Sequence, residues 1–271
     1  MVVAVLMALQ SAVGMLATSL YQDTEDWILA AWFGNDLVTL LVAVPLLVWS
    51  LSATKTGSKR AELVWYSMLG YSIYNYGYYL FGAALSWFFP LYVVLFSLGV
   101  ITLILALSRL DVEAMAADFA SSAPVRWIGG YMIFTGGGLT VAWIGQWATF
   151  MLTGSTPSLG QEGFRLVAAM DLSVMVPWFL IGAVLLLKRR PWGYVIGSII
   201  IMKGATYTLV LTASSTVAAW RGIDGALGQI PIWGVWTVVG GAAVWGLLTS
   251  LDEPASETSD GTLVTSPVRS R

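Results

Sequence analysis

The chain has 271 residues, of which 58% are hydrophobic and 10% are charged, with a net charge of −2 and a mean hydropathy of +0.78. Soluble domains carry roughly 25% charged residues, so this composition predicts a protein in the lipid bilayer and argues against a nucleic-acid partner. The absence of Cys and His excludes disulfides, thiol nucleophiles, Cys/His zinc sites and histidine acid–base catalysis, and we expect no metal site, catalytic residue or cofactor.

Residues 1–110 contain four stretches that are each long enough to cross a bilayer, which takes about 20 apolar residues. We predict spanning helices from Val2 to Leu20, from Asn35 to Ser52, from Leu63 to Phe89 and from Pro90 to Leu110. Together they form a first four-helix membrane domain. The third stretch differs from the others because it carries many tyrosines.

These tyrosines follow the period of a helix. Tyr71, Tyr74, Asn75 and Tyr78 lie at positions i, i+3, i+4 and i+7, which share one face, and Tyr76 lies among them. Buried hydroxyl and amide groups need partners, so we expect this face to look into the protein and away from lipid. The face is either a platform for a ligand or a hydrogen-bonded packing seam, and the pattern leaves both open.

Residues 111–126 are polar and amphipathic, which predicts a linker helix lying along the membrane interface. Residues 127–251 form a second four-helix membrane domain. Its predicted spans run from Trp127 to Leu152, from Leu166 to Leu187, from Trp192 to Ala213 and from Ile230 to Leu251. Residues 252–271 are rich in Ser, Thr, Pro and acids, which predicts a disordered cytoplasmic tail. The predicted fold class is therefore an all-α transmembrane bundle of eight helices.

The basic residues choose the orientation of this bundle. One set of links and the tail contain Lys55, Lys59, Arg60, Arg109, Arg126, Lys188, Arg189, Arg190, Arg269 and Arg271. The alternate links contain Arg165 and Arg221. Because positive residues concentrate on the cytoplasmic side, we predict that the first set and both termini are cytoplasmic.

The two halves match in their spacing. Pro90 and Asp111 are as far apart as Pro231 and Asp252. Further matches pair Gly70 with Gly197, Gly77 with Gly204, Gln10 with Gln146, and the acid and proline of the second span, Asp36 and Pro45, with those of the sixth, Asp171 and Pro177. Four spans are an even number, so these would be two tandem repeats with one orientation, related by an axis along the membrane normal.

Lys203 is the strongest single indication of a site. It lies 11 residues past Trp192, which places it about 16 Å into the span and near mid-bilayer. A cation at this depth costs on the order of 3 kcal/mol or more if it faces lipid, so it marks either a functional site or a lysine held by internal partners. The repeat places Lys203 opposite Tyr76 and next to Asn75, with Tyr207 contributing from the same helix.

Asp171 is the natural counter-ion of Lys203 by type, but its expected height in the membrane is wrong. We expect Asp36 and Asp171 to lie in or before the first turns of their helices, where acids cap the chain and complement the helix dipole. The residues that could bind a ligand are Lys203, Asn75, Tyr71, Tyr74, Tyr76, Tyr78, Tyr207, Asp171, Asp36, Gln10 and Gln146.

The run from Tyr74 to Ala83, with Phe88 to Tyr92 after it, resembles a group of uncharacterised bacterial polytopic integral membrane proteins. The likeness covers the third and fourth spans clearly and the rest loosely. It implies a location in the bacterial cytoplasmic (inner) membrane. It implies no activity.

Three functions from different classes fit these observations. The first is a carrier or channel for a small solute or ion, with a polar site near the midplane. The second is a membrane scaffold or accessory subunit, in which the polar layer is structural. The third is an intramembrane enzyme acting on a lipid or quinone, which the missing His, Cys and paired carboxylates disfavour. The predicted partners are the lipid bilayer and a small-molecule or ion substrate; the sequence names no partner protein.

Overall fold

Long apolar runs fold as helices, because a backbone surrounded by lipid must satisfy its own hydrogen bonds. The computed structural model describes residues 1–23, 25–157 and 159–252. Its α-helices are α1 (Val2–Leu16), α2 (Asp26–Val38), α3 (Val44–Ala53), α4 (Lys59–Gly82), α5 (Phe89–Leu107), α6 (Val112–Ala117), α7 (Val125–Thr153), α8 (Gly160–Met170), α9 (Val176–Leu187), α10 (Pro191–Trp220) and α11 (Ala226–Thr249). The predicted all-α class is confirmed.

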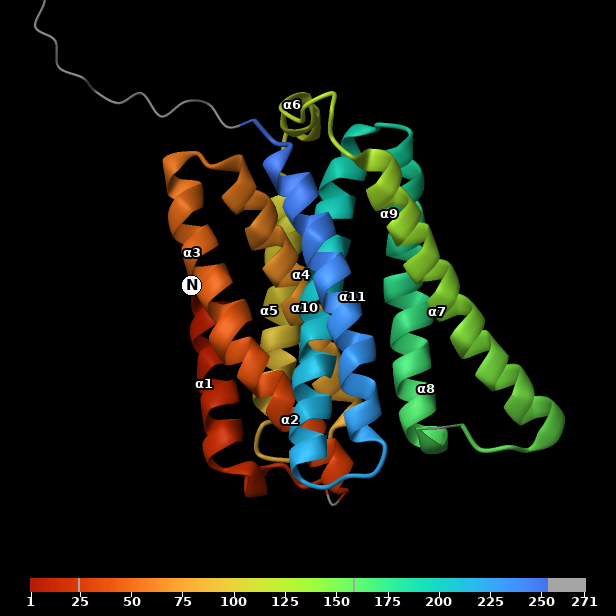
Figure 1. Cartoon of the computed structure of the whole chain (residues 1–271). Helices are drawn as coiled ribbons and strands as arrows, with labels where there is room; N and C mark the ends of the chain where they lie inside the picture. Colours follow the sequence, from red (N-terminus) through yellow and green to blue (C-terminus); the bar gives the residue numbers. More distant parts are fainter. Residues whose placement is uncertain (24, 158, 253–271) are drawn as a thin grey trace, which may run out of the picture.

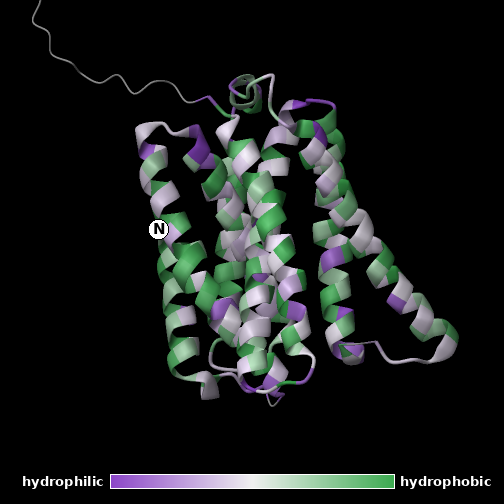
Figure 2. Cartoon of the chain, viewed as in Figure 1, coloured by the Kyte–Doolittle hydropathy of each residue, from purple (hydrophilic) through white to green (hydrophobic). Residues whose placement is uncertain are grey.

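Several of these helices have the length and hydropathy of membrane spans. In the described part of the chain, six segments qualify: Asp26–Thr56, Phe89–Leu107, Val125–Thr153, Gly160–Leu187, Pro191–Trp220 and Ala226–Thr249. They indicate a multi-pass membrane protein. Figure 2 agrees, since hydrophobic residues cover the helices and the most hydrophilic ones gather at the two ends of the bundle.

Two predicted spans, α1 and α4, are not among the six. Helix α1 has 15 residues, or about 22 Å, which is shorter than the roughly 30 Å of a bilayer core. Its predicted continuation to Leu20 is wrong, because a 3₁₀ turn at Thr18–Leu20 follows it. Helix α4 has 24 residues and is long enough, but its tyrosines lower its hydropathy, and most of its residues are buried inside the bundle.

Two helices begin earlier than predicted, which moves two acids. Helix α2 begins at Asp26, and Asp36 lies ten residues further along; α8 begins at Gly160, eleven residues before Asp171. The prediction that these acids lie in or before first turns is therefore wrong. The first turns of α8 are amphipathic, so hydropathy alone does not include them. Residues 27–33 of α2 are apolar, and the helix continues from them through the polar pair Asn35 and Asp36.

Each half contains one π-helical segment, and the two occur at matching places. They are η2 (Thr39–Ala43), directly before α3, and η4 (Asp171–Met175), directly before α9. Each is followed by a Val-Pro pair, with Pro45 or Pro177 at the start of the next helix. Proline has no N–H to donate to the preceding turn, and the wider π turn keeps the helix continuous there.

Helices α4 and α10 form the centre of the bundle and pack against each other, as Figure 1 shows. Helix α2 crosses α10 where Gly34 faces Ser214; a Cβ atom on Gly34 would lie 2.5 Å from the Ser214 backbone. On the other side, Gly82 of α4 faces Leu166 of α8 just as closely. Glycine at these two crossings lets the helices approach, which is a common device in membrane bundles.

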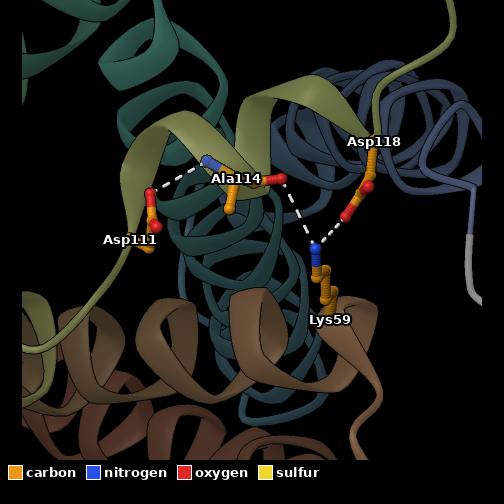
Figure 3. Close-up of polar contacts among 4 residues, drawn as sticks. All are labelled: Lys59, Asp111, Ala114 and Asp118. Atoms are coloured by element: carbon orange, nitrogen blue, oxygen red, sulfur yellow. Dashed lines mark hydrogen bonds and ion pairs between the residues drawn. The ribbon is translucent and has the colours of Figure 1, made fainter.

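The linker between the halves lies across one end of the bundle. Its helix α6 has six residues, so the predicted 111–126 helix is longer than the real one. Figure 3 shows how it is held: Lys59 contacts the Asp118 carboxylate and the Ala114 carbonyl, and Asp111 accepts a hydrogen bond from the Ala114 N–H at 3.0 Å. Pro124, which cannot continue a helix, precedes α7.

The residues after α11 return to this linker. The Ala120 N–H donates to the Ser250 carbonyl at 2.7 Å, and Phe119 and Leu251 form an antiparallel bridge. The guanidinium of Arg60 donates to the Leu251 carbonyl, so the beginning of α4 joins the same contact. The predicted disordered tail, from residue 253 onward, lies outside the described residues.

Candidate functional site

A cavity of about 540 Å³ lies in the second half of the chain. Helices α7, α8–α9, α10 and α11 form its walls, and α2 and α4 add a few side chains. It extends from the turn between α10 and α11, near Asp224, to Phe179. In Figure 1, α7 leans away from the other helices toward that end of the bundle.

Helix α10 contributes one continuous face to this cavity. Gly204, Tyr207, Leu211, Ser215 and Ala218 line it, three or four residues apart. From the first to the last of them is 14 residues, or about 21 Å along the helix. The cavity therefore reaches from one end of the bundle to roughly the middle of this helix.

Aromatic rings make up much of the lining. They are Trp27, Tyr78, Tyr131, Phe134, Trp143, Phe179, Tyr207, Trp233 and Trp236. Among the described lining residues the charged ones are Asp171 and Asp224, and both are acids. Asp171 lies deep in the cavity, while Asp224 is exposed at its mouth.

Phe179 closes the inner end of the cavity. Its ring lies 3.1 Å from where a Cβ atom on Gly204 would be, and its Cβ is equally close to Gly136 of α7. The side chain is buried in an apolar cluster that continues through Met132 and Leu186 toward the α6 end of the bundle. Phe179 thus lies between the inner part of the cavity and the α6 end of the bundle.

Asp171 is positioned by three different helices. It begins the π segment η4, and its side chain is 6% exposed. The Tyr74 hydroxyl of α4 donates to Oδ1 at 2.7 Å, and the Trp143 indole N–H of α7 donates to Oδ2 at 2.9 Å. A carboxylate has about four acceptor positions, so these two bonds leave acceptor capacity on the cavity side.

Lys203 lies behind this acid and is 2% exposed. Its Nζ is 3.0 Å from the centre of the Tyr74 ring, 4.5 Å from the centre of the Tyr207 ring and 2.7 Å from the Met175 sulfur. Lys203 therefore faces the protein interior. Its partner on α4 is the face of the Tyr74 ring, which is a cation–π contact.

Tyr74 connects the two charges. Its ring face lies against Lys203, while its hydroxyl bonds to Asp171. The lysine itself does not line the cavity, but Met175 and Tyr207, which contact its ammonium group, do. The result is a buried layer in which a tyrosine separates a cation from a carboxylate.

The first half contains a second buried acid, in what we call the Asp36 cluster: Gln10, Tyr21, Asp36, Tyr76 and Tyr79. Gln10 donates to Asp36 at 3.2 Å and to the Tyr21 hydroxyl at 2.8 Å. Tyr21 and Tyr79 donate to the carboxylate at 2.5 and 3.2 Å, and Tyr76 donates to the Gln10 carbonyl at 3.1 Å. Asp36 is 1% exposed.

Aromatic side chains pack closely around this cluster. The Tyr21 ring lies 6.3, 6.2 and 5.3 Å from the rings of Trp32, Tyr79 and Phe88. A Cβ atom on Gly14 would collide with Asp36 and Tyr21. None of the cluster residues lines the cavity described above, so the Asp36 carboxylate is bound to side chains of the chain itself.

The remaining predicted residues divide between these regions. Tyr71 shares a 2.7 Å hydrogen bond with Thr39 and donates to Asn35 at 3.2 Å, which is a packing role. Asn75 is buried, and its Nδ2 has no partner in the described part of the chain. Gln146 is half-buried on α7. Of the predicted candidates, Tyr78, Asp171 and Tyr207 line the cavity, while Tyr74 and Lys203 lie directly behind it.

Sequence reasoning missed Trp143 and Tyr21 as partners of the two acids. Trp143 precedes Asp171 by 28 residues, and Gln10 precedes Asp36 by 26. Spacing alone favoured Gln146, whereas the indole that donates to Asp171 belongs to Trp143, three residues earlier on α7. An indole N–H on the inner face of a span, one turn from that glutamine, was the available signal.

Comparison with protein-family models, with curated proteins and with solved structures finds no match for this chain. The likeness of the Tyr74–Ala83 run to a bacterial membrane protein group therefore stays a prediction. The function has to be argued from the geometry of the site.

Proposed function

We propose that this chain is a carrier that binds a small solute in the cavity beside Asp171 and moves it across the bilayer. The observation that carries this proposal is the cavity itself. Its 540 Å³ falls within the roughly 300–1,000 Å³ typical of small-molecule sites, and it leads to the only described layer in which buried Lys and Asp side chains come together. Intramembrane charges in such a place are a common mark of a substrate path.

The closed inner end favours a carrier over an open channel. Phe179 and the apolar cluster behind it separate the cavity from the α6 end of the bundle. A carrier exposes its site to one side at a time, whereas a channel needs a continuous path. The second candidate, a scaffold, draws its support from the densely packed Asp36 cluster.

The proposed topology has eight crossings, with α1 the shortest, in a bacterial cytoplasmic membrane. The described basic residues support the orientation, since Lys59 and Arg189 both contact the linker, while Arg165 and Arg221 lie at the opposite end. The α6 end is then cytoplasmic by the positive-inside rule. The cavity opens to the outside.

The proposed duplication rests on matching order and packing. Each half has a helix, a helix broken by a π segment, and two further helices. Helix α3 packs on α4 as α9 packs on α10, and α4 packs on α5 as α10 packs on α11. This is the arrangement expected of two repeats with one orientation. Superposition of residues 2–107 on residues 125–249 tests it: helices that do not overlay in the same order rule it out.

Cysteine labelling tests whether solutes can reach the cavity, because the chain has no cysteine of its own. Ser215 and Thr206 lie on the same helix and are buried to a similar extent, but Ser215 lines the cavity and Thr206 does not. We expect a membrane-impermeant thiol reagent to label Ser215→Cys on intact cells and to leave Thr206→Cys unmodified. If neither variant reacts in purified protein, the cavity is not accessible and the scaffold function replaces the carrier.

The same reagent tests the orientation. Lys55 and Gln161 are exposed at opposite ends of the bundle. We expect Gln161→Cys to react on intact cells and Lys55→Cys to react only after the membrane is opened. The reverse pattern would place the mouth of the cavity in the cytoplasm.

A further inference from the structure

We infer that the solute is an organic cation with an aromatic or otherwise apolar body. This inference rests on the proposed function, since it names the class of molecule that the cavity beside Asp171 accepts. Three independent features of the second half support it: the sign of the lining charges, the aromatic walls, and the way in which the first half fills the matching place.

The charges that line the cavity have one sign. Asp171 lies at its inner part and Asp224 at its mouth, and no described lining residue is basic. The nearest cation, Lys203, is covered by the side chains of Met175 and Tyr207. A ligand in the cavity therefore meets a carboxylate first, and an anionic ligand would find no positive partner.

The walls suit the body of such a ligand. Tyr207 and Trp143 stand beside Asp171, and Trp233 and Trp236 line the opposite side on α11. Aromatic faces attract cations, and a ring combined with a carboxylate is the usual way in which proteins hold organic ammonium groups. The apolar remainder of the lining excludes a small, strongly hydrated metal ion, which needs several oxygen ligands.

The Asp36 cluster shows how this fold surrounds an acid when the chain fills the space itself. There the Tyr21 ring enters between Trp32 and Phe88, and its hydroxyl donates to the carboxylate. An aromatic body bearing one hydrogen-bond donor thus occupies the first half. Asp171 also accepts from two aromatic side chains, Tyr74 and Trp143, but it borders the cavity, so space for a further donor remains beside it. The solute would act there as Tyr21 acts at Asp36.

A pair of probes with one shape and opposite charge tests the inference. Tetraphenylphosphonium and tetraphenylborate are both four-ring spheres, one cationic and one anionic. We expect the full chain, purified in detergent, to bind tetraphenylphosphonium saturably in equilibrium dialysis and not to bind tetraphenylborate beyond empty micelles. Asp171→Asn should weaken binding of the cation about tenfold or more, because it removes a charge contact. Asp224→Asn, at the exposed mouth, should change it by about twofold or less.

A second measurement does not depend on the folding of the Asp171 variant. With Asp171 in place, tetraphenylphosphonium should slow the labelling of Ser215→Cys, and tetraphenylborate should not. If both probes bind equally, or protect Ser215→Cys from labelling equally, the inference that the solute is a cation is wrong, although the cavity still binds solutes. Binding of neither probe, with Ser215→Cys still labelled, also overturns it. An unlabelled Ser215→Cys would overturn the proposed function itself.

Discussion

Asp36 and Asp171 each lie about ten residues into a helix that is interrupted by a π segment, and their surroundings differ. In the first half, the chain turns after the short α1, and Tyr21 folds inward onto the acid. In the second half, α7 has 29 residues, about 43 Å, and leans outward, as Figure 1 shows. Asp36 is therefore enclosed by a side chain that precedes its helix, whereas Asp171 borders the cavity.

The comparison also separates two uses of tyrosine. On α4, Tyr76 and Tyr79 complete the Asp36 cluster, while Tyr74, on the same helix, holds Asp171 and Lys203. The central helix thus serves both acids from opposite sides. The following changes test how far the two environments differ, beginning with the largest expected effect.

Removing the side chain that fills the first half should have the largest effect. We expect Tyr21→Ala to lower the free energy of unfolding by about 5 kcal/mol, from the lost ring and its hydrogen bond to a carboxylate. Added p-cresol, which is the tyrosine side chain, should recover part of the thermal stability of this variant in detergent and leave the wild type unchanged. Toluene, which lacks the hydroxyl, is the control; equal rescue by both would mean that Asp36 plays no part.

Removing each acid compares the two environments directly. We expect Asp36→Ala to cost about 3 kcal/mol, because the donors of Gln10, Tyr21 and Tyr79 lose their acceptor in a closed space. Asp171→Ala should cost about 1 kcal/mol, because water in the cavity can accept from Tyr74 and Trp143. Thermal unfolding of the two variants measures these losses of stability. Equal losses would contradict the difference between an enclosed Asp36 and an Asp171 that borders a cavity.

Replacing a glycine by alanine in each half compares how tightly the two regions are packed. Gly34→Ala places a Cβ atom 2.5 Å from the Ser214 backbone, so we expect a loss of about 2 kcal/mol. Gly138 lines the cavity and has nothing within 4 Å of such an atom. Gly138→Ala should therefore gain about 0.5 kcal/mol from its better helix propensity. A destabilised Gly138→Ala would show that the cavity wall is packed more tightly than described.

The smallest expected effect is at the linker that joins the halves. Lys59 and Asp118 form a partly exposed ion pair, which is typically worth under about 1 kcal/mol. We expect Lys59→Met to lower stability by about 0.5 kcal/mol, with the loss shrinking further in high salt. A double-mutant cycle with Asp118→Ala measures the pair; a coupling of several kcal/mol would mean that the halves depend on this contact.

Much of the fold follows from hydropathy and helical period. Eight helical segments appear in the predicted order, and the tyrosine face of α4 is buried as its polar groups require. The residues at which the helices begin and end were less predictable. Helix α2 begins nine residues before Asn35, because the polar pair Asn35 and Asp36 lies inside the helix and does not mark its start. The linker helix α6 begins at the Asp111 cap and ends at Ala117, directly before the residues that bond to Ser250 and Leu251, and composition does not reveal such tertiary contacts.

The site was only partly predictable, for a different reason. The depth of Lys203 and the polarity of Tyr74 follow from their positions along helices, and both lie in one buried layer. The cavity depends on the angle at which α7 leaves the bundle, which no residue pattern in α7 encodes on its own. The glycines at positions 136–138 of α7 are compatible with close packing and with open space. In the structure Gly136 packs against Phe179, while Gly137 and Gly138 have no neighbour within 4 Å of an added Cβ atom.

The contact between Leu251 and Arg60 has a consequence for how the protein is made. A ribosome releases α4 long before it releases α11, so the linker cannot acquire its partners Ser250 and Leu251 until α11 has been synthesised. These contacts, which we call the clasp, therefore form only after the described helices that precede them have been made. A chain stopped after Thr249 would contain every helix without this clasp, and its linker should be cut by protease faster than that of the whole chain.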